Sequence, residues 1–163
     1  MGRAMFYHMT RKPVQATAPP LLERARREGW RVIVRAGTPQ RAEWFDEALW
    51  LYGDVSFLPH GVAGGPHDAD QPILLTSDPA PVTRSQAQAL MVIDGAPVDP
   101  AETRDLERVF ILFDGGEPAA VQQARGQWTA MKNAGVHAQY WSEESGRWEM
   151  NSETGAPEAD DGG

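Results

Sequence analysis

Histidines and acidic side chains are the residues in this chain best suited to metal binding or acid–base catalysis. None of the four histidines has the i, i+4 helical spacing of a zinc hydrolase. One group of metal-ligand types lies close together in the sequence: His60, His67, Asp68 and Asp70. The glycine- and proline-rich segment around this group favours a solvated polar loop. We therefore expect no metal site.

Patterns for a catalytic nucleophile are also missing. The chain has no cysteine, which excludes thiolate nucleophiles, disulfides and zinc–thiolate sites. Ser56 and Ser77 lack the G-x-S-x-G context of a nucleophile elbow. The carboxylates in "FDEALW" and "FDG" are explained by positions on a helix surface and at a strand end, without acid–base work. We therefore expect the protein not to be an enzyme.

Glycines that would hold a phosphate group are absent from the turns where they are needed. The dinucleotide fingerprint places glycines directly after the first strand, where this chain has "TRKPVQATAPP". The turn "AGTPQ" has one glycine and no following Gly-Lys-Ser/Thr, and "GVAGGPH" follows no expected strand. The sequence therefore predicts no nucleotide site and no cofactor.

The elements that position these residues alternate between strands and helices. Apolar runs predict strands over 5–9, 31–37, 73–76, 89–95, 108–115 and 137–143. Helices are predicted over 19–30, 38–53 and 117–135, with Thr38 as the cap and Pro39 in the first turn of the second. Because several strands are apolar on both faces, the pattern indicates a three-layer α/β sandwich around a mostly parallel sheet.

A chain of 163 residues is long enough for one domain with a single substantial core. We expect this α/β domain to cover residues 1–150. The remaining segment 151–163, "NSETGAPEADDGG", has no apolar periodicity and four acidic residues, so it is expected to be a disordered acidic tail.

The net charge of −8 is unevenly distributed. Residues 1–36 carry eight basic and two acidic side chains, whereas the rest of the chain carries seven basic and 21 acidic ones. One end could meet an anionic partner, although a solvated basic helix face is the simpler explanation. Strong direct binding to nucleic acid is disfavoured, since it needs a coherent basic face. Without a membrane span or signal peptide in the sequence, we expect a cytoplasmic protein with no membrane partner.

Aromatic and apolar side chains exceed the needs of the predicted core around residues 38–61. The predicted helix 38–53 has two apolar stripes and carries Trp50 on a third side. The following "SFLPHG" (56–61) then takes large apolar side chains into a segment too rich in glycine, proline and charge to be core. The residues leave two explanations open: a helix buried on two sides, or a face that binds a partner.

Several multi-residue motifs, in order over residues 1–148, resemble one family. They are "MFYHMT", "GWRVIVRAG", "FDEALW", "SFLPHG" with the following "AGGPH" and "DQPILLT", "FILFDG", and "ARGQWTAMKNAG" with a later "YW". Together they are similar to the chi subunit of bacterial DNA polymerase III, an accessory protein of the clamp loader. The resemblance implies a Rossmann-like fold without nucleotide binding. It also implies a non-enzymatic adaptor that links the psi subunit of the clamp loader, or a repair helicase in its place, to the C-terminal tail of single-stranded DNA-binding protein.

The resemblance implies a psi- or helicase-binding face around "SFLPHG". The residues at matching positions are Trp50, Phe57, Leu58, Pro59 and His60. Aromatic side chains at the centre of an interface commonly contribute ~2 kcal/mol or more each, which is a physical reason for a surface loop to hold them. The alternative that Phe57 fills the edge of its own core stays open.

The resemblance implies a second site, for the tail, at Phe113, Arg125, Trp128 and Lys132. The last three are spaced i, i+3, i+7 and so share one helix face, which suits an acidic peptide ending in an apolar residue with a free carboxylate. Val121 stands at a position that is often basic in the family, so weaker binding or the use of another basic group is expected. The alternative is an ordinary amphipathic helix with Trp128 in the core. For the whole protein, a nucleotide-dependent enzyme and a direct single-stranded nucleic-acid-binding module also remain open.

Overall fold

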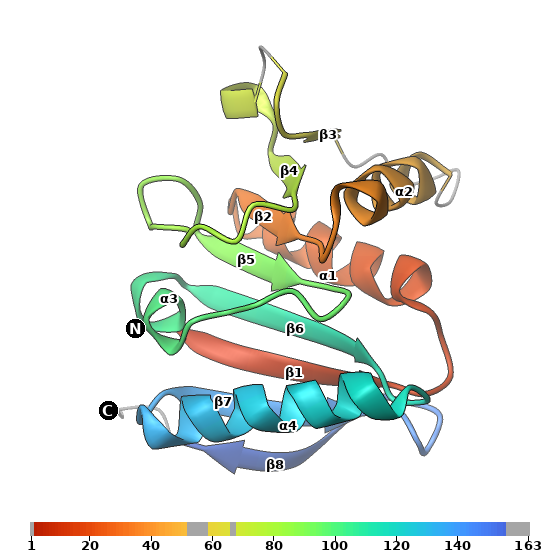
Figure 1. The fold of residues 1–163 in the computed structure, drawn as a ribbon, viewed down its shortest axis with the longest axis vertical. Helices are drawn as coiled ribbons and strands as arrows, with labels where there is room; N and C mark the ends of the chain where they lie inside the picture. Colours follow the sequence, from red (N-terminus) through yellow and green to blue (C-terminus); the bar gives the residue numbers. More distant parts are fainter. Residues whose placement is uncertain (1, 52–58, 66–67, 156–163) are drawn as a thin grey trace.

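An eight-stranded, mostly parallel sheet with helices on both faces forms the protein (Figure 1). The computed structural model describes residues 2–51, 59–65 and 68–155. Its strands are β1 (Arg3–Met9), β2 (Val32–Arg35), β3 (His60–Val62), β4 (Ile73–Thr76), β5 (Ala89–Val92), β6 (Arg108–Asp114), β7 (His137–Ser142) and β8 (Glu149–Thr154). Its helices are α1 (Val14–Arg27), α2 (Pro39–Trp50), α3 (Pro100–Asp105) and α4 (Pro118–Asn133), with a 3₁₀ turn at Asp68–Asp70.

The strand order is β3-β4-β2-β5-β6-β1-β7-β8, and only β8 pairs antiparallel with its neighbour. Helices α1 and α2 pack on one face, and α3 and α4 pack on the other. The central strands are buried on both faces because side chains alternate: Met5 and Tyr7 of β1 face α1, whereas Ala4 and Phe6 face α4. The predicted three-layer, Rossmann-like α/β sandwich is confirmed.

Helix starts follow their capping residues. Thr38 accepts a hydrogen bond from Arg41 N at 3.1 Å and Pro39 occupies the first turn of α2, as predicted. Helix α1 begins at Val14, earlier than predicted, and contains Pro19 and Pro20 in its interior. Both prolines lack the N–H group of an interior helical residue, which is why the sequence favoured a later start.

Three elements were not predicted: α3, β3 and β8. The expectation that residues 151–163 are a disordered tail is wrong for residues 151–154, which belong to β8 and pair with β7. Strand β8 is an edge strand with mainly exposed side chains, so it shows no apolar periodicity, and its backbone pairing supplies the order. Residues 156–163 lie outside the described part of the chain.

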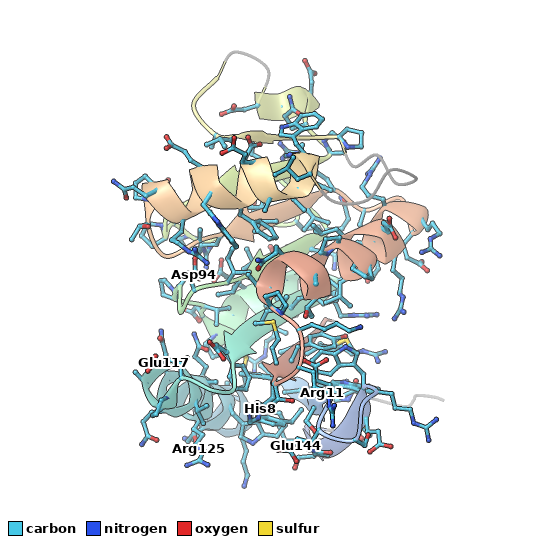
Figure 2. The ribbon with its side chains drawn as sticks, turned by 90° about the vertical axis from the view of Figure 1, so that its right-hand side faces the viewer. His8, Arg11, Asp94, Glu117, Arg125 and Glu144 are labelled. Atoms are coloured by element: carbon cyan, nitrogen blue, oxygen red, sulfur yellow. The ribbon has the colours of Figure 1, made fainter. Side chains whose placement is uncertain are left out.

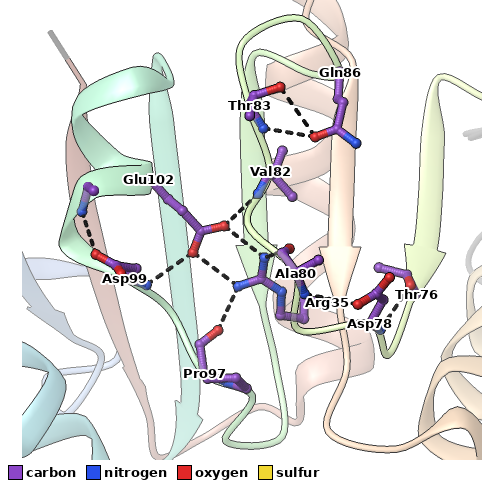
Figure 3. A network of polar contacts seen from close by, with 11 residues as sticks. Arg35, Thr76, Asp78, Ala80, Val82, Thr83, Gln86, Pro97, Asp99 and Glu102 are labelled. Carbon is purple, nitrogen blue, oxygen red and sulfur yellow. Dashed lines mark hydrogen bonds and ion pairs between the residues drawn. The ribbon is translucent and has the colours of Figure 1, made fainter.

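A buried ion pair joins β2 to helix α3 (Figure 3). Arg35, at the end of β2, is 1% exposed and donates to both carboxylate oxygens of Glu102 in α3, at 2.8 and 3.2 Å. Its guanidinium also donates to the carbonyls of Pro97 and Ala80. The Glu102 carboxylate in turn accepts the N–H of Val82 at 2.7 Å. This ion pair therefore holds two connections to the sheet, the one between β4 and β5 and the one between β5 and α3.

No helix in the described ranges is long and apolar enough to cross a membrane.

Candidate protein-binding sites

Helix α4 presents the basic stripe expected from the sequence. It starts at the Glu117 cap and packs on the sheet through Ala124 and Met131. Arg125 and Lys132 are exposed, and Trp128 is half-buried. The two cations lie seven residues, or about 10 Å, apart along the helix axis. Neither forms an ion pair with any of residues 2–51, 59–65 and 68–155, so both charges remain available to an acidic ligand.

An aromatic cluster lies under this stripe, between α4 and the sheet. Trp128 makes edge-on contacts with Phe6 and Tyr140, at ring-centroid distances of 5.3 and 5.7 Å. Tyr140 also contacts Phe113 edge-on at 5.9 Å and stacks on Phe6 at 6.4 Å. Phe113 itself is 5% exposed, so Trp128 and Tyr140 supply the accessible apolar surface beside Arg125.

Tyr140 gives the cluster a polar end. Its hydroxyl lies 3.0 Å from Nδ1 of His8. Burial raises the pKa of Tyr140, while the positive charge of Arg125 opposes that shift and Glu144 adds to it. The hydroxyl therefore stays neutral close to the Arg125 guanidinium. His8, Arg125 and Glu144 gather at one end of the molecule (Figure 2).

Sequence reasoning missed Tyr140 and His8 as members of this group. In β7 alternate residues point to opposite faces, so Ala138 and Tyr140 face α4. That alternation was readable in "HAQYWS", but the pairing of β7 with β1, which brings Tyr140 beside Phe6, was not. Val121 packs against the core instead of adding a charge.

The second predicted site lies at the end of α2. Trp50 is 52% exposed, and its ring centroid lies 4.3 Å from that of His60. His60 is in β3 and 5% exposed; its Nε2 lies 3.0 Å from the carbonyl oxygen of Asp46 and 3.3 Å from its carboxylate. Burial raises the pKa of Asp46, and His60 opposes that rise. His60 thus lies beneath the exposed Trp50 ring and supports it.

Pro59, next to His60, is half-buried. Phe57 and Leu58 of the same predicted face lie outside the described residues.

A cleft of about 710 Å³ opens at the carboxyl ends of β1, β5 and β6. This is where doubly wound folds bind nucleotides. Its lining includes three carboxylates, those of Asp94, Asp114 and Glu117. Arg41 pairs with Asp94 at 2.6 Å, with its guanidinium carbon 3.9 Å from the Trp44 ring centroid. Arg11, Lys12 and Arg41 also line the cleft, so its lining carries as many basic as acidic side chains.

The residues weighed as metal ligands are engaged otherwise. The Asp68 carboxylate accepts the N–H groups of Gly64 and Gly65, at 2.8 and 3.0 Å. His67 is outside the described residues. Across residues 2–51, 59–65 and 68–155, no three metal-binding side chains form a group that could hold an ion.

Comparison with known families identifies a matching family. The family model described as DNA polymerase III chi subunit, HolC, matches residues 1–139. The match includes the α4 stripe and the Trp50 region, and it ends just before Tyr140 and β8. No curated protein is similar enough to count as a match.

Proposed function

Because the chain belongs to the DNA polymerase III chi subunit family and so has an accessory role in DNA replication, we propose that it acts as a non-enzymatic adaptor with two protein-binding faces. The α4 stripe binds the acidic C-terminal tail of single-stranded DNA-binding protein. The Trp50 face binds the psi subunit of the clamp loader, or a repair helicase in its place.

The observation that carries this proposal is the position of Arg125. Its guanidinium is exposed, forms no ion pair with any described residue and lies beside the half-buried rings of Trp128 and Tyr140. An arginine next to an apolar surface suits a peptide that ends in an apolar side chain and a carboxylate. Lys132 extends the positive charge along the helix for acidic residues further up the peptide.

Charge sets the strength of this interaction. With a net charge of −8, the protein repels an acidic peptide at long range, and this repulsion is screened beyond about 8–10 Å at physiological salt. Binding must therefore come from direct contact at the stripe. A short peptide buries little surface, so we expect micromolar affinity, about −8 kcal/mol. With Val121 at an often basic position, two cations rather than three contribute.

The Trp50 face suits a different ligand. A large ring that is half exposed on a buried histidine is typical of the apolar centre of a protein interface. The contact of His60 with Asp46 fixes the imidazole ring, so the Trp50 ring that packs on it is held in place before a partner binds. The proposed partner contributes a complementary apolar surface.

Titration calorimetry with a peptide copying the acidic tail tests the first face. Loss of a charge-assisted pair costs ~1.5–3 kcal/mol, so Arg125→Ala should weaken binding by roughly ten- to a hundredfold. Arg27→Ala is the matched control, because it removes one exposed charge from α1 on the other face of the sheet. A peptide without its terminal apolar residue should bind as poorly to the wild type as the full peptide does to Arg125→Ala.

Salt and alternative ligands separate this proposal from its rivals. Raising the salt concentration should weaken the wild type more than Arg125→Ala. Equal affinity of wild type and Arg125→Ala would place the tail site elsewhere. A saturable rise in melting temperature with nucleotide would favour the enzyme hypothesis. Steeply salt-dependent retention of single-stranded DNA by the protein alone would favour the nucleic-acid-binding module.

A further inference from the structure

The loop between β1 and α1 holds a carboxylate from the far end of the chain. Three consecutive backbone N–H groups, of Thr10, Arg11 and Lys12, donate to one oxygen, Oε2 of Glu143, at 3.0, 2.9 and 3.2 Å. Glu143 follows β7 and is 3% exposed. Successive N–H groups that converge on one point form an anion-binding nest.

The nest occupies the position where this class of fold binds phosphate. Strand β1 lies between β6 and β7; α1 leaves it on one face, and α4 leaves β6 on the other. Ligand phosphate in doubly wound folds is held at such a switch point, by the loop and helix N-terminus that follow the first strand. The three nest residues Thr10, Arg11 and Lys12 also line the 710 Å³ cleft.

Helix α1 has no negative charge of its own at this end. Its N-cap is Pro13, which makes no side-chain capping bond, and its first turn contains no acidic residue. The partial positive charge of a helix N-terminus favours an anion nearby. Glu143, which directly follows the neighbouring strand β7, supplies that anion.

We propose that the β1–α1 loop is a phosphate-type anion site whose ligand in this protein is its own Glu143 carboxylate. The loop lacks glycine because one carboxylate oxygen needs less room than a pyrophosphate group, whose approach the glycines normally permit. Arg11 secures the arrangement by donating to the carbonyls of Glu143 and Glu144, at 3.0 and 2.8 Å. This inference does not depend on the proposed tail site.

The donors for a phosphate oxygen are present, but an internal carboxylate occupies them. Removing that carboxylate should therefore create an anion site without any new donor. Because the loop lacks the glycines that let a pyrophosphate group approach the backbone, inorganic phosphate is the appropriate probe.

Thermal unfolding of the full chain in phosphate, against chloride at equal ionic strength, tests the proposal. Glu143→Ala should melt lower than the wild type in chloride. Phosphate at ten times its dissociation constant should then raise its melting temperature by about 3–6 °C more than it raises that of the wild type. Glu144→Ala is the matched control: it removes an exposed neighbouring carboxylate that no N–H of the nest contacts, so it should respond like the wild type. The general salting effect of phosphate acts on all three proteins alike.

Amide resonances identify the site directly. In Glu143→Ala, titration with phosphate should shift the backbone amide signals of Thr10, Arg11 and Lys12, and these signals should not move in the wild type. If Glu143→Ala does not fold, Glu143→Leu replaces it, since it keeps much of the side-chain volume and offers no acceptor to the three N–H groups. Amide signals of Thr10–Lys12 that respond to phosphate no more than those of the wild type would overturn the proposal.

Discussion

Breaking the ion pair between Arg35 and Glu102 should destabilise the protein more than loss of any exposed charge. In Arg35→Met, the Glu102 carboxylate loses both of its guanidinium bonds and keeps only the N–H groups of Val82 and Asp99. The carbonyls of Pro97 and Ala80 also lose their donor. Removing one partner of a buried pair costs about 3–5 kcal/mol, because the remaining charge stays buried and unpaired. For a domain of this size that corresponds to a fall in melting temperature of about 6–20 °C.

Urea unfolding with linear extrapolation measures this loss. Arg84→Met is the matched control, since Arg84 pairs with Glu107 at 2.9 Å but is 48% exposed and should contribute less than about 1 kcal/mol. Replacing both charges, in Arg35→Met with Glu102→Leu, should not restore stability, because the N–H groups of Val82 and Asp99 are then left without an acceptor. A loss below about 1 kcal/mol in Arg35→Met would refute the reasoning that this pair holds the connecting segments to the sheet.

Three further perturbations have defined outcomes. Trp50→Ala should abolish capture of psi or its helicase substitute in a pull-down with little change in melting temperature, because the side chain is 52% exposed; a comparable loss of folding would make this residue structural. Burial raises the pKa of Tyr7 from 10.0 to about 12, so the stability that its neutral phenol provides is complete below pH 10 and is lost as the pH rises towards 12. Urea titrations at several pH values should show this fall in the free energy of unfolding in the wild type and not in Tyr7→Phe. A hydrogen bond from His137, 2.5 Å away, lowers the pKa of Glu153 from its ordinary value, so the contribution of this bond to folding stability is lost as the pH falls through the lowered pKa. In His137→Ala, the titration of the Glu153 carboxyl resonance should return towards that of a free carboxyl group. An unchanged titration would mean that the bond does not form in solution.

The fold was predictable where local chemistry specifies it. Apolar runs located β1, β2, β4, β5, β6 and β7, and Thr38 with Pro39 located the start of α2. Strand β8 was not predictable, because its exposed side chains carry no periodicity and its order comes from pairing with β7. The buried position of Arg35 was not predicted either, because from the sequence it was only counted among the basic residues of 1–36. Its burial depends on Glu102, 67 residues away, and no local pattern reports that contact.

The candidate sites were likewise predictable only where local spacing specifies them. Helical spacing alone places Arg125, Trp128 and Lys132 on one face. Tyr140 and His8, which complete that surface, come from two strands whose pairing is a property of the whole sheet. From the missing glycines, the sequence predicted no nucleotide site at the β1–α1 loop. The sequence could not reveal that the loop still converges three N–H groups, since their acceptor follows more than 130 residues later.

Strand β7 connects the basic stripe of α4 to the nest. It carries Tyr140 to the face under Arg125, and the residue directly after its last one, Glu143, has its carboxylate in the nest after β1. An anion site at a switch point and a cationic helix face would otherwise compete for the same acidic ligand, because they lie at one end of the sheet (Figure 2). With the nest filled from within, Arg125 remains a cation at this end that no described carboxylate neutralises. If the proposed function holds, an acidic peptide is expected at the surface of α4, beside the rings of Trp128 and Tyr140, rather than in the cleft.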